Sequence, residues 1–368
     1  MLIQPRRRRR IWPRLLLLGL IGLAITYYVR TRGAIPLAQQ QSPTEITETS
    51  AEHVLEGDRL FQEGKIKEAI AEYERATELD PQNATAYARL GKLFTLRKRS
   101  SEAVSNAQKA VELDPQNAEG YANLAMALDW QRDYDGAINA ALRAIELDPD
   151  YAPAHAFLAE AYADKGYLDK ALDAAEKAVY LDDGSVDAHR NLGYVLERLG
   201  DYQGAIAEYK RAIELGPNLG YLYIGLGRNY RVLDDYEQAI AQFQKAIEVD
   251  PDNPEGYDSL GLIYYDQKDI ERAAVQFQRA IEVDPDYAYS YGHLGWCYYT
   301  QRNYEEAIPQ FKKAIELGAD SIEYYYELGW CYALLDECDE ARLWLQRALE
   351  IDPYSKPAQE GLKACEGK

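Results

Sequence analysis

The sequence predicts an all-α protein in which short antiparallel helix pairs stack into an elongated solenoid. Two observations lead to this prediction. Nine consecutive blocks of 34 residues fill residues 50–355 without an insertion or deletion, and the same small residues return at the same places in each block. Such a period is typical of stacked helical units, because one unit is too thin to bury its apolar face alone.

Three columns of small residues set the register of the blocks. Ala stands twentieth and twenty-seventh in all nine blocks, and only Gly or Ala stands eighth. Side chains this small let two helices approach closely. The eighth residues are Gly57, Gly91, Ala125, Ala159, Gly193, Gly227, Gly261, Gly295 and Gly329. Pro stands thirty-second in seven blocks, where it ends one helix before the next block begins.

Each block predicts two helices joined by a short turn. In block 254–287, Tyr257, Leu260 and Tyr264 share one helical face, and a second apolar face runs from Ala273 through Phe277. An Asp or Asn before the second helix is expected to cap it, because its side-chain oxygen can accept from free backbone N–H groups. The expected caps are Asp133, Asp201, Asp235, Asp269 and Asn303.

This pattern resembles the tetratricopeptide repeat family. The resemblance covers the nine blocks 50–83, 84–117, 118–151, 152–185, 186–219, 220–253, 254–287, 288–321 and 322–355. It implies a right-handed superhelix whose first helices line a concave surface that binds extended partner segments. Residues 356–368 continue the phase, with Lys363 at the small-residue place, and are expected to form a capping helix.

The amino terminus predicts a single transmembrane helix that acts as a signal-anchor. The basic segment 1–10 ends in five consecutive Arg, and residues 11–29 are mainly apolar with Trp12 near one end and Tyr27 and Tyr28 near the other. As a helix this segment measures about 28 Å, close to the hydrocarbon thickness of about 30 Å. The aromatic residues are placed as at membrane interfaces. Residues 30–49 are expected to be a flexible linker, because they are rich in Gln, Ser, Thr and Pro.

A cleaved signal peptide is the alternative for this terminus, with residues 15–25 as its apolar region and Ala38 before the cut. Basic residues favour the cytoplasmic side of a membrane. Six Arg lie at or before Arg14, and only Arg30 and Arg32 follow the apolar segment. We therefore expect a cytoplasmic amino terminus and repeats on the periplasmic side of a bacterial membrane, or its equivalent.

Charge and composition argue against several functions. The formal net charge is −20, and since residues 1–49 hold eight Arg and two Glu, a charge of +6, the rest of the chain carries −26. Such an acidic body repels phosphate backbones, so no nucleic-acid partner is expected. The sequence holds no Gly-rich phosphate loop, Ser-centred elbow or Cys-x-x-Cys pair. We expect no enzymatic activity, no catalytic or metal site, no cofactor and no small-molecule substrate.

Three of the four cysteines share one column. Cys297, Cys331 and Cys365 stand where other blocks hold Ala, Val or Ile, so they are interpreted as buried apolar side chains. Equivalent atoms on stacked helices are expected about 8–10 Å apart, beyond disulfide reach. Cys338 is the remaining candidate for a bridge, with Cys331 as its expected partner.

The second, fifth, ninth and twelfth residues of a block share one helical stripe, which is expected to face solvent on the concave surface. The stripe is basic in blocks 186–219 and 220–253. The partner-binding residues predicted there are Arg190, Tyr194, Arg228 and Arg231, with Arg198 adjacent. Guanidinium groups bind carboxylates bidentately. The patch is expected either to bind an acidic flank of a partner or to neutralise Asp187, Glu197 and nearby carboxylates.

The same surface becomes aromatic in the last three blocks. The predicted contact residues are Tyr265, Tyr289, Trp296, Tyr299, Tyr326 and Trp330. Aromatic side chains on a solvent-facing stripe supply contact area at a small loss of entropy. The alternative is that they fill the core. We expect this groove to bind an apolar or aromatic segment of a protein or peptide.

The sequence therefore favours a membrane-anchored interaction scaffold that assembles or localises an envelope or secretion complex through its groove. One alternative is a regulatory or adaptor subunit of a membrane-associated enzyme of glycan or lipid assembly, acting through the edges of the stack. Another is a periplasmic repeat protein that is secreted after signal-peptide cleavage.

Overall fold

The computed structural model describes residues 48–319 and 321–366. The predicted segments 1–10 and 11–29, and nearly all of the linker 30–49, lie outside these residues. Every regular element in the described part is an α-helix, so the prediction of an all-α fold is confirmed. None of these helices is both long enough and apolar enough to cross a membrane.

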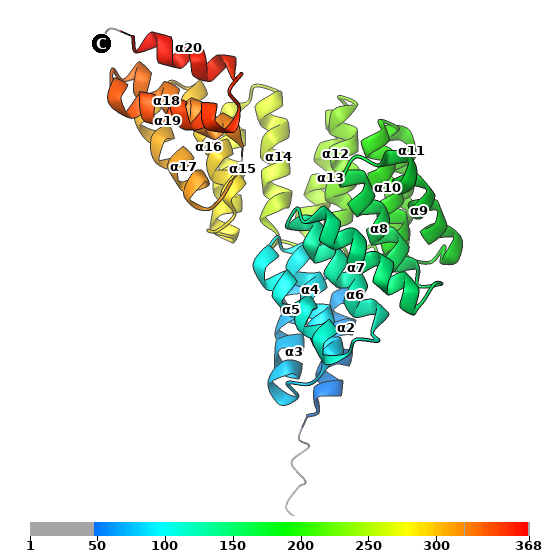
Figure 1. The fold of residues 1–368 in the computed structure, drawn as a ribbon. Helices are drawn as coiled ribbons and strands as arrows, with labels where there is room; N and C mark the ends of the chain where they lie inside the picture. The colour runs from blue at the N-terminus through cyan, green and yellow to red at the C-terminus, as the bar shows by residue number, and fades with distance from the viewer. Residues whose placement is uncertain (1–47, 320, 367–368) are drawn as a thin grey trace, which may run out of the picture. The chain divides into compact units, whose positions relative to one another are not determined.

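Nine helix pairs follow one another through the described residues, one pair in each of the nine blocks, here called repeats 1–9 (Figure 1). The first helices are α2 (Ser50–Gln62), α4 (Ala84–Leu96), α6 (Ala118–Trp130), α8 (Ala152–Asp164), α10 (Val186–Leu199), α12 (Gly220–Val232), α14 (Pro254–Asp266), α16 (Ala288–Thr300) and α18 (Ile322–Leu334). The second helices are α3 (Ile66–Leu79), α5 (Ser100–Leu113), α7 (Tyr134–Leu147), α9 (Leu168–Leu181), α11 (Tyr202–Leu215), α13 (Tyr236–Val249), α15 (Ile270–Val283), α17 (Tyr304–Glu316) and α19 (Cys338–Ile351).

The turn inside each pair contains a residue in the left-handed backbone conformation. The fifteenth residue of every repeat has a positive φ, for example 80° at Gly64 and 57° at Lys98. The backbone N–H of Lys98 donates to the carbonyl of Thr95 at 2.9 Å. The left-handed residue reverses the chain within a few residues, so the same tight turn joins the two helices of all nine pairs.

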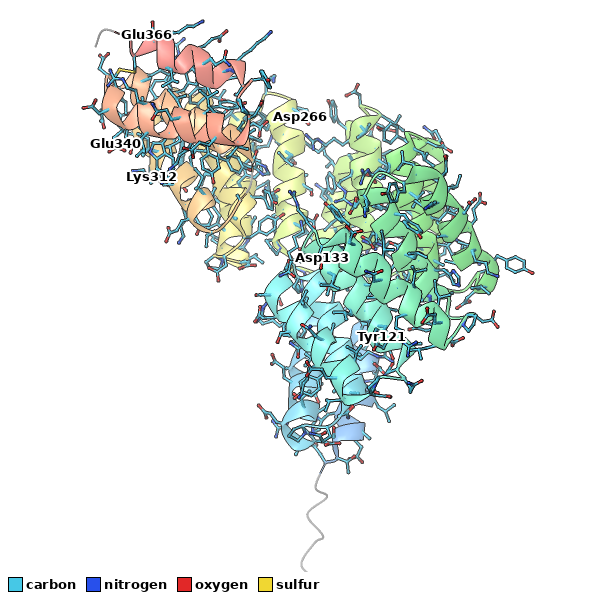
Figure 2. The ribbon with its side chains drawn as sticks, viewed as in Figure 1. Tyr121, Asp133, Asp266, Lys312, Glu340 and Glu366 are labelled. Atoms are coloured by element: carbon cyan, nitrogen blue, oxygen red, sulfur yellow. A yellow bond between two sulfur atoms is a disulfide. The ribbon has the colours of Figure 1, made fainter. Side chains whose placement is uncertain are left out.

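Side-chain caps begin four of the nine second helices in the described residues. The carboxylates of Asp133, Asp201, Asp235 and Asp269 each accept from the N–H three residues later, at 2.9–3.2 Å. Figure 2 labels Asp133 before α7. The expected cap at Asn303 is wrong, because its side chain makes no such bond. Two acidic residues in the first turn of α17 favour the positive end of that helix instead.

Volumes are matched between the two helices of a repeat, except in repeat 2, where Gly91 faces Ala107. A Cβ at Gly261 would lie only 2.6 Å from Cε1 of Phe277, the twenty-fourth residue of repeat 7. Repeats 3 and 4 hold Ala at both places, and all four of these Ala are fully buried. The eighth-place column is therefore small because the facing side chain fills the space, as close packing requires.

The helix expected after the last repeat is α20 (Lys356–Ala364), which covers α18 and α19 (Figure 1). A disulfide joins Cys338, at the start of α19, to Cys365, directly after α20, with their Cα atoms 5.4 Å apart. The expected partner of Cys338 is therefore wrong, and Cys331 and Cys297 are buried free thiols. The column spacing describes stacked first helices, whereas α20 also packs on a second helix and brings Cys365 to Cys338.

Candidate functional site

The first helices of successive repeats enclose a cavity of about 730 Å³, a volume typical of ligand sites. Four predicted contact residues, Arg190, Tyr194, Arg228 and Tyr289, lie in its wall. Other lining residues include Arg97, Lys98, Asp129, Trp130, Glu160, Asp164, Glu255 and Tyr287. Charges of both signs and aromatic rings therefore meet in one cavity.

The turn between α4 and α5 reaches the far wall of this cavity. Nη2 of Arg97 lies 2.9 Å from Oδ1 of Asp250, and these side chains are only 12% and 4% exposed. Nζ of Lys98 lies 3.1 Å from Oε1 of Glu255 and 5.3 Å from the centre of the Tyr287 ring. We call residues 97–99 the clasp. It joins repeat 2 to repeats 6 and 7.

Further contacts join the first two repeats to repeat 5. Nζ of Lys92 lies 2.6 Å from Oδ2 of Asp187, and both side chains are largely buried. The side-chain amide of Asn218 donates to the carbonyl of Gln62 at 3.2 Å. The repeats thus wind back on themselves, and part of the inner surface is covered by the chain's own side chains.

Three carboxyl groups gather on one side of the cavity. Asp129 and Glu160 are 3% exposed, and Glu160 accepts from the indole N–H of Trp130 at 3.2 Å. Burial, together with the charges of Glu160 and Asp164, raises the pKa of Asp129 to about 9. Its surroundings therefore favour the protonated form of Asp129.

This part of the stripe corrects an expectation about exposure. The positions assigned to a solvent-facing stripe include Ala156, Glu160 and Ala163 of repeat 4, and all three are buried. The stripe lines the inner surface, but neighbouring first helices and the basic side chains of repeat 5 cover it. Helical periodicity shows which face points inward and does not show how tightly the superhelix curves.

Carboxylates of repeat 4 neutralise the basic residues of repeat 5. Arg190 donates to both oxygens of Glu160, at 2.6 and 2.9 Å. Burial opposes the charge of Arg190, yet Glu160 outweighs it and the pKa of Arg190 stays above its usual value. Tyr194 and Arg198 both donate to Asp164. The alternative of internal neutralisation therefore describes Arg190 and Arg198, whose partners lie in repeat 4, and Tyr194 donates to the same carboxylate as Arg198.

The two Arg of repeat 6 differ in their pairing. Nε of Arg231 lies 2.7 Å from Oδ2 of Asp266, which Figure 2 labels at the end of α14. Nη1 of Arg228 lies 3.6 Å from Glu255, and its side chain is 45% exposed. Because Glu255 also pairs with Lys98, Arg228 keeps more capacity for an additional carboxylate than Arg231.

The aromatic residues of repeats 7–9 form a connected cluster. The Trp296 ring lies 6.1 Å from Tyr265 and 5.6 Å from the buried Tyr324, measured between ring centres. Tyr265, Trp296, Tyr299 and Tyr326 are all half-buried. Burial raises the pKa of Tyr299 and of Tyr326 to about 12, and the charge of Glu327 adds to this rise. Neither solvent contact nor core filling alone describes these side chains.

Two other predicted aromatic residues lie apart from this cluster. The indole N–H of Trp330 donates to the carbonyl of Pro357 at 3.0 Å, so Trp330 helps to hold α20. Tyr289 is 37% exposed, and its ring centre lies 6.0 Å from Tyr287 and from Nζ of Lys98. Trp330 therefore has a structural role, whereas Tyr289 belongs to the cavity.

Several residues of these sites were not predicted from the sequence. Glu327 stands sixth in repeat 9, a place where other repeats hold side chains such as Asn123, Asn191 and His293, all buried. An acidic residue in that column was the available signal. Asp129 gave no signal, because Asp is common on exposed faces and the cavity depends on contacts between distant repeats.

The chain belongs to the tetratricopeptide repeat family. Four family models described as TPR repeat or tetratricopeptide repeat match residues 57–96 and 227–268, 259–322 and 298–356, 118–151 and 186–219, and 84–117 and 152–184. Together they account for almost all of the nine blocks. No curated protein sequence matches the chain.

Several solved structures are similar to the chain. The APC/C hetero-tetramer of Cut9 and Hcn1 is 15% identical, with a TM-score of 0.61 over 86% of this chain and 76% of that one. PilF of Pseudomonas aeruginosa is 19% identical over 58% of this chain and 96% of that one, with a TM-score of 0.49. Yeast Tom70 is 17% identical over 86% and 88%, also with a TM-score of 0.49. At 15% identity, the likeness to the Cut9–Hcn1 structure extends to the fold alone.

Proposed function

We propose that this chain is a non-catalytic scaffold that binds a segment of a partner protein along its inner surface. The cavity of about 730 Å³ is the observation that carries the proposal. Its wall combines charged and aromatic side chains from many successive repeats, which suits a polypeptide segment with several kinds of side chain.

Within the cavity, Arg228 and Tyr289 are the predicted residues best placed to contact the partner. Both are more than a third exposed, and Arg228 has only a long contact to Glu255. Arg190, Arg198 and Arg231 instead hold carboxylates of the chain itself. The partner is therefore proposed to place an acidic group near Arg228 and an apolar group against Tyr289.

The proposal includes a membrane tether. Residues 11–29 would anchor the chain, and the repeats would assemble or localise an envelope or secretion complex on the periplasmic side. The Cys338–Cys365 disulfide supports this placement, because structural disulfides persist in oxidising compartments and are rare in the cytosol. Protease digestion of intact cells, followed by detection of the repeats, tests this part of the proposal separately.

Crosslinking of the full-length chain in membranes tests the scaffold. Partners captured with the parent chain should be lost from the double variant Arg228→Ala and Tyr289→Ala. Tyr180→Ala is the matched control, because Tyr180 is 82% exposed on the second helix α9. Partners that remain bound to the double variant at parental levels would rule out this part of the inner surface.

A further inference from the structure

Glu327 is a half-buried carboxyl group without a cation beside it, and its Oε2 atom is buried. In the described residues no Lys or Arg forms an ion pair with it, and its Oε2 has no hydrogen-bond partner. Burial, and then the charge of Glu323 on the same helix, raise the pKa of Glu327 to about 8. The indole N–H of Trp296 lies beside the carboxylate and lowers the pKa only in part.

Aromatic side chains from three successive first helices lie near this carboxyl group, where Trp296, Tyr299 and Tyr326 pack against one hydrophobic cluster. The tyrosines among these side chains are Tyr265 of α14, Tyr299 of α16 and Tyr326 of α18. Burial is the main cause that raises the pKa of each hydroxyl, and the negative charge of Glu327 raises it further. Trp296 packs against Tyr265. Four aromatic residues predicted from the sequence as contact residues thus converge on one acid that the sequence analysis missed.

The carboxyl group of Glu327 has no counter-ion from the described residues, so a cation would complete the site. A carboxylate taken out of water without a counter-ion is unfavourable, so the free protein keeps Glu327 protonated over much of the neutral range. The faces of Trp and Tyr attract cations. The acidic body of the chain, −26 outside residues 1–49, also attracts basic partners.

We infer that Glu327, Tyr265, Trp296, Tyr299 and Tyr326 form a binding site for a lysine or arginine side chain of the partner. The ammonium or guanidinium group would pair with the carboxylate of Glu327 while its aliphatic stem lies against the rings. This inference rests on the proposed function and adds the chemistry of the partner to it. It replaces the expectation of a purely apolar or aromatic segment in repeats 7–9.

Titration of the full-length chain in detergent tests the site directly. The probe is Nα-acetyl-lysine methylamide, and the neutral Nα-acetyl-norleucine methylamide is its matched comparison. The indole N–H resonance of Trp296, assigned through Trp296→Phe, should shift saturably with the lysine probe and remain still with norleucine. Glu327→Gln should weaken the lysine affinity by about tenfold or more, because the charge-assisted pair is lost.

Two controls separate this site from general attraction to an acidic surface. Glu350→Gln removes an exposed carboxylate on α19 and should leave the lysine titration unchanged. Calorimetry at pH 7.5 in buffers of different ionisation enthalpy should detect proton release on binding in the parent and none in Glu327→Gln. Carboxylates that are already ionised on the surface release no proton.

Equal lysine affinity in the parent and in Glu327→Gln would overturn the inference, as would an unmoved Trp296 resonance. Gln has nearly the shape of protonated Glu, so the variant is expected to fold, and its thermal melting checks this. The scaffold proposal has its own readout in the Arg228 and Tyr289 variant. Crosslinked partners lost from that variant but retained by Glu327→Gln would refute the cation site alone.

Discussion

The eighth residue of each repeat shows how one atom constrains a helix pair. A Cβ at Gly261 would meet Phe277 at 2.6 Å, whereas repeats 3 and 4 hold Ala at both of the corresponding places. The constraint is therefore on the sum of the two volumes and not on glycine itself.

We expect Gly261→Ala to lower the free energy of unfolding by about 1–3 kcal/mol, and Phe277→Ala by about 3–5 kcal/mol. The double variant should lose less than the sum, because the missing ring leaves room for the new methyl group. Urea denaturation measures all three. Gly261→Ala combined with Phe311→Ala of repeat 8 is the control and should be additive.

Asp129 gives the protein a pH dependence with a defined sign. Its pKa is about 9 in the folded chain and about 3.9 when unfolded. The folded state therefore binds the extra proton, and this stabilisation is complete at low pH and lost as the pH rises toward 9. Between pH 6 and 8 the slope is up to about 1.4 kcal/mol per pH unit.

Asp129→Asn should flatten this part of the stability profile. Denaturation midpoints at pH 6, 7 and 8 measure the effect, and Asp133→Asn is a control, since Asp133 lies in an exposed turn. Glu327 contributes in the same direction, so a smaller slope remains. An unchanged slope in Asp129→Asn would show that Asp129 is ionised in the folded state.

At the scale of single residues, the features that recur in every repeat could be predicted from the sequence, whereas the side-chain partners that differ between repeats could not. The columns that contain Gly261 and Ala273 could be recognised because a small residue recurs at the same place in every repeat. The partners of Arg190 and Arg198 lie 30 and 34 residues away in the chain. Position alone places such residues on neighbouring helices, but the choice among several nearby carboxylates depends on side-chain geometry.

Among the elements, α20 is held by three kinds of contact. The disulfide joins its end to Cys338, Arg342 donates to the carbonyl of Cys365 at 3.0 Å, and Trp330 donates to that of Pro357. The helix shields the apolar end of the last pair, where Leu345 is fully buried. Solenoids need such an end to remain soluble.

Reduction of the disulfide should loosen this element. The bridge closes a loop with a sequence separation of 27 residues, and loops of this size contribute about 3 kcal/mol. Thermal melting and hydrogen exchange of residues 356–366, with and without a dithiol reductant, should show the loss in the parent. In the variant Cys338→Ser, which cannot form the disulfide, melting and hydrogen exchange should be the same with and without the reductant.

Thiol counting checks the same element. Cys297 and Cys331 are buried, and burial raises the pKa of each thiol to about 12. A thiol-reactive dye should therefore label none of the four cysteines in the folded, oxidised chain and two after denaturation. Four labelled thiols in denaturant without reductant would contradict the disulfide.

At the scale of the whole solenoid, the clasp holds distant repeats together. Arg97→Met leaves Asp250 buried without its partner, and burial already raises the pKa of that carboxyl. We expect a loss of about 3 kcal/mol or more and faster hydrogen exchange in residues 97–99 and 250–255. Arg97→Met with Asp250→Leu should recover much of the stability.

An exposed pair provides the control for the clasp. Arg143 and Glu146 on α7 are 43% and 67% exposed, so Arg143→Met should change stability by less than about 1 kcal/mol. If Arg97→Met has an equally small effect, the clasp does not hold repeats 2, 6 and 7 together in solution.

The winding of the repeats was the least predictable feature. Periodicity established the stacked pairs, and the family resemblance implied a superhelix. The contact between Arg97 and Asp250 spans 153 residues, and it depends on small angles between neighbouring pairs that accumulate over several repeats. No local sequence pattern reports the sum of those angles.

The clasp also changes how the chain is expected to unfold. A solenoid in which each unit touches only its neighbours can unzip from either end, one unit at a time. Here repeats 1–7 are closed into a loop by Asn218, Asp187, Asp250 and Glu255. Loss of any one of these repeats disturbs all the others, so they should melt in one concerted transition, while repeats 8 and 9 rely on the oxidised cap for their cooperativity.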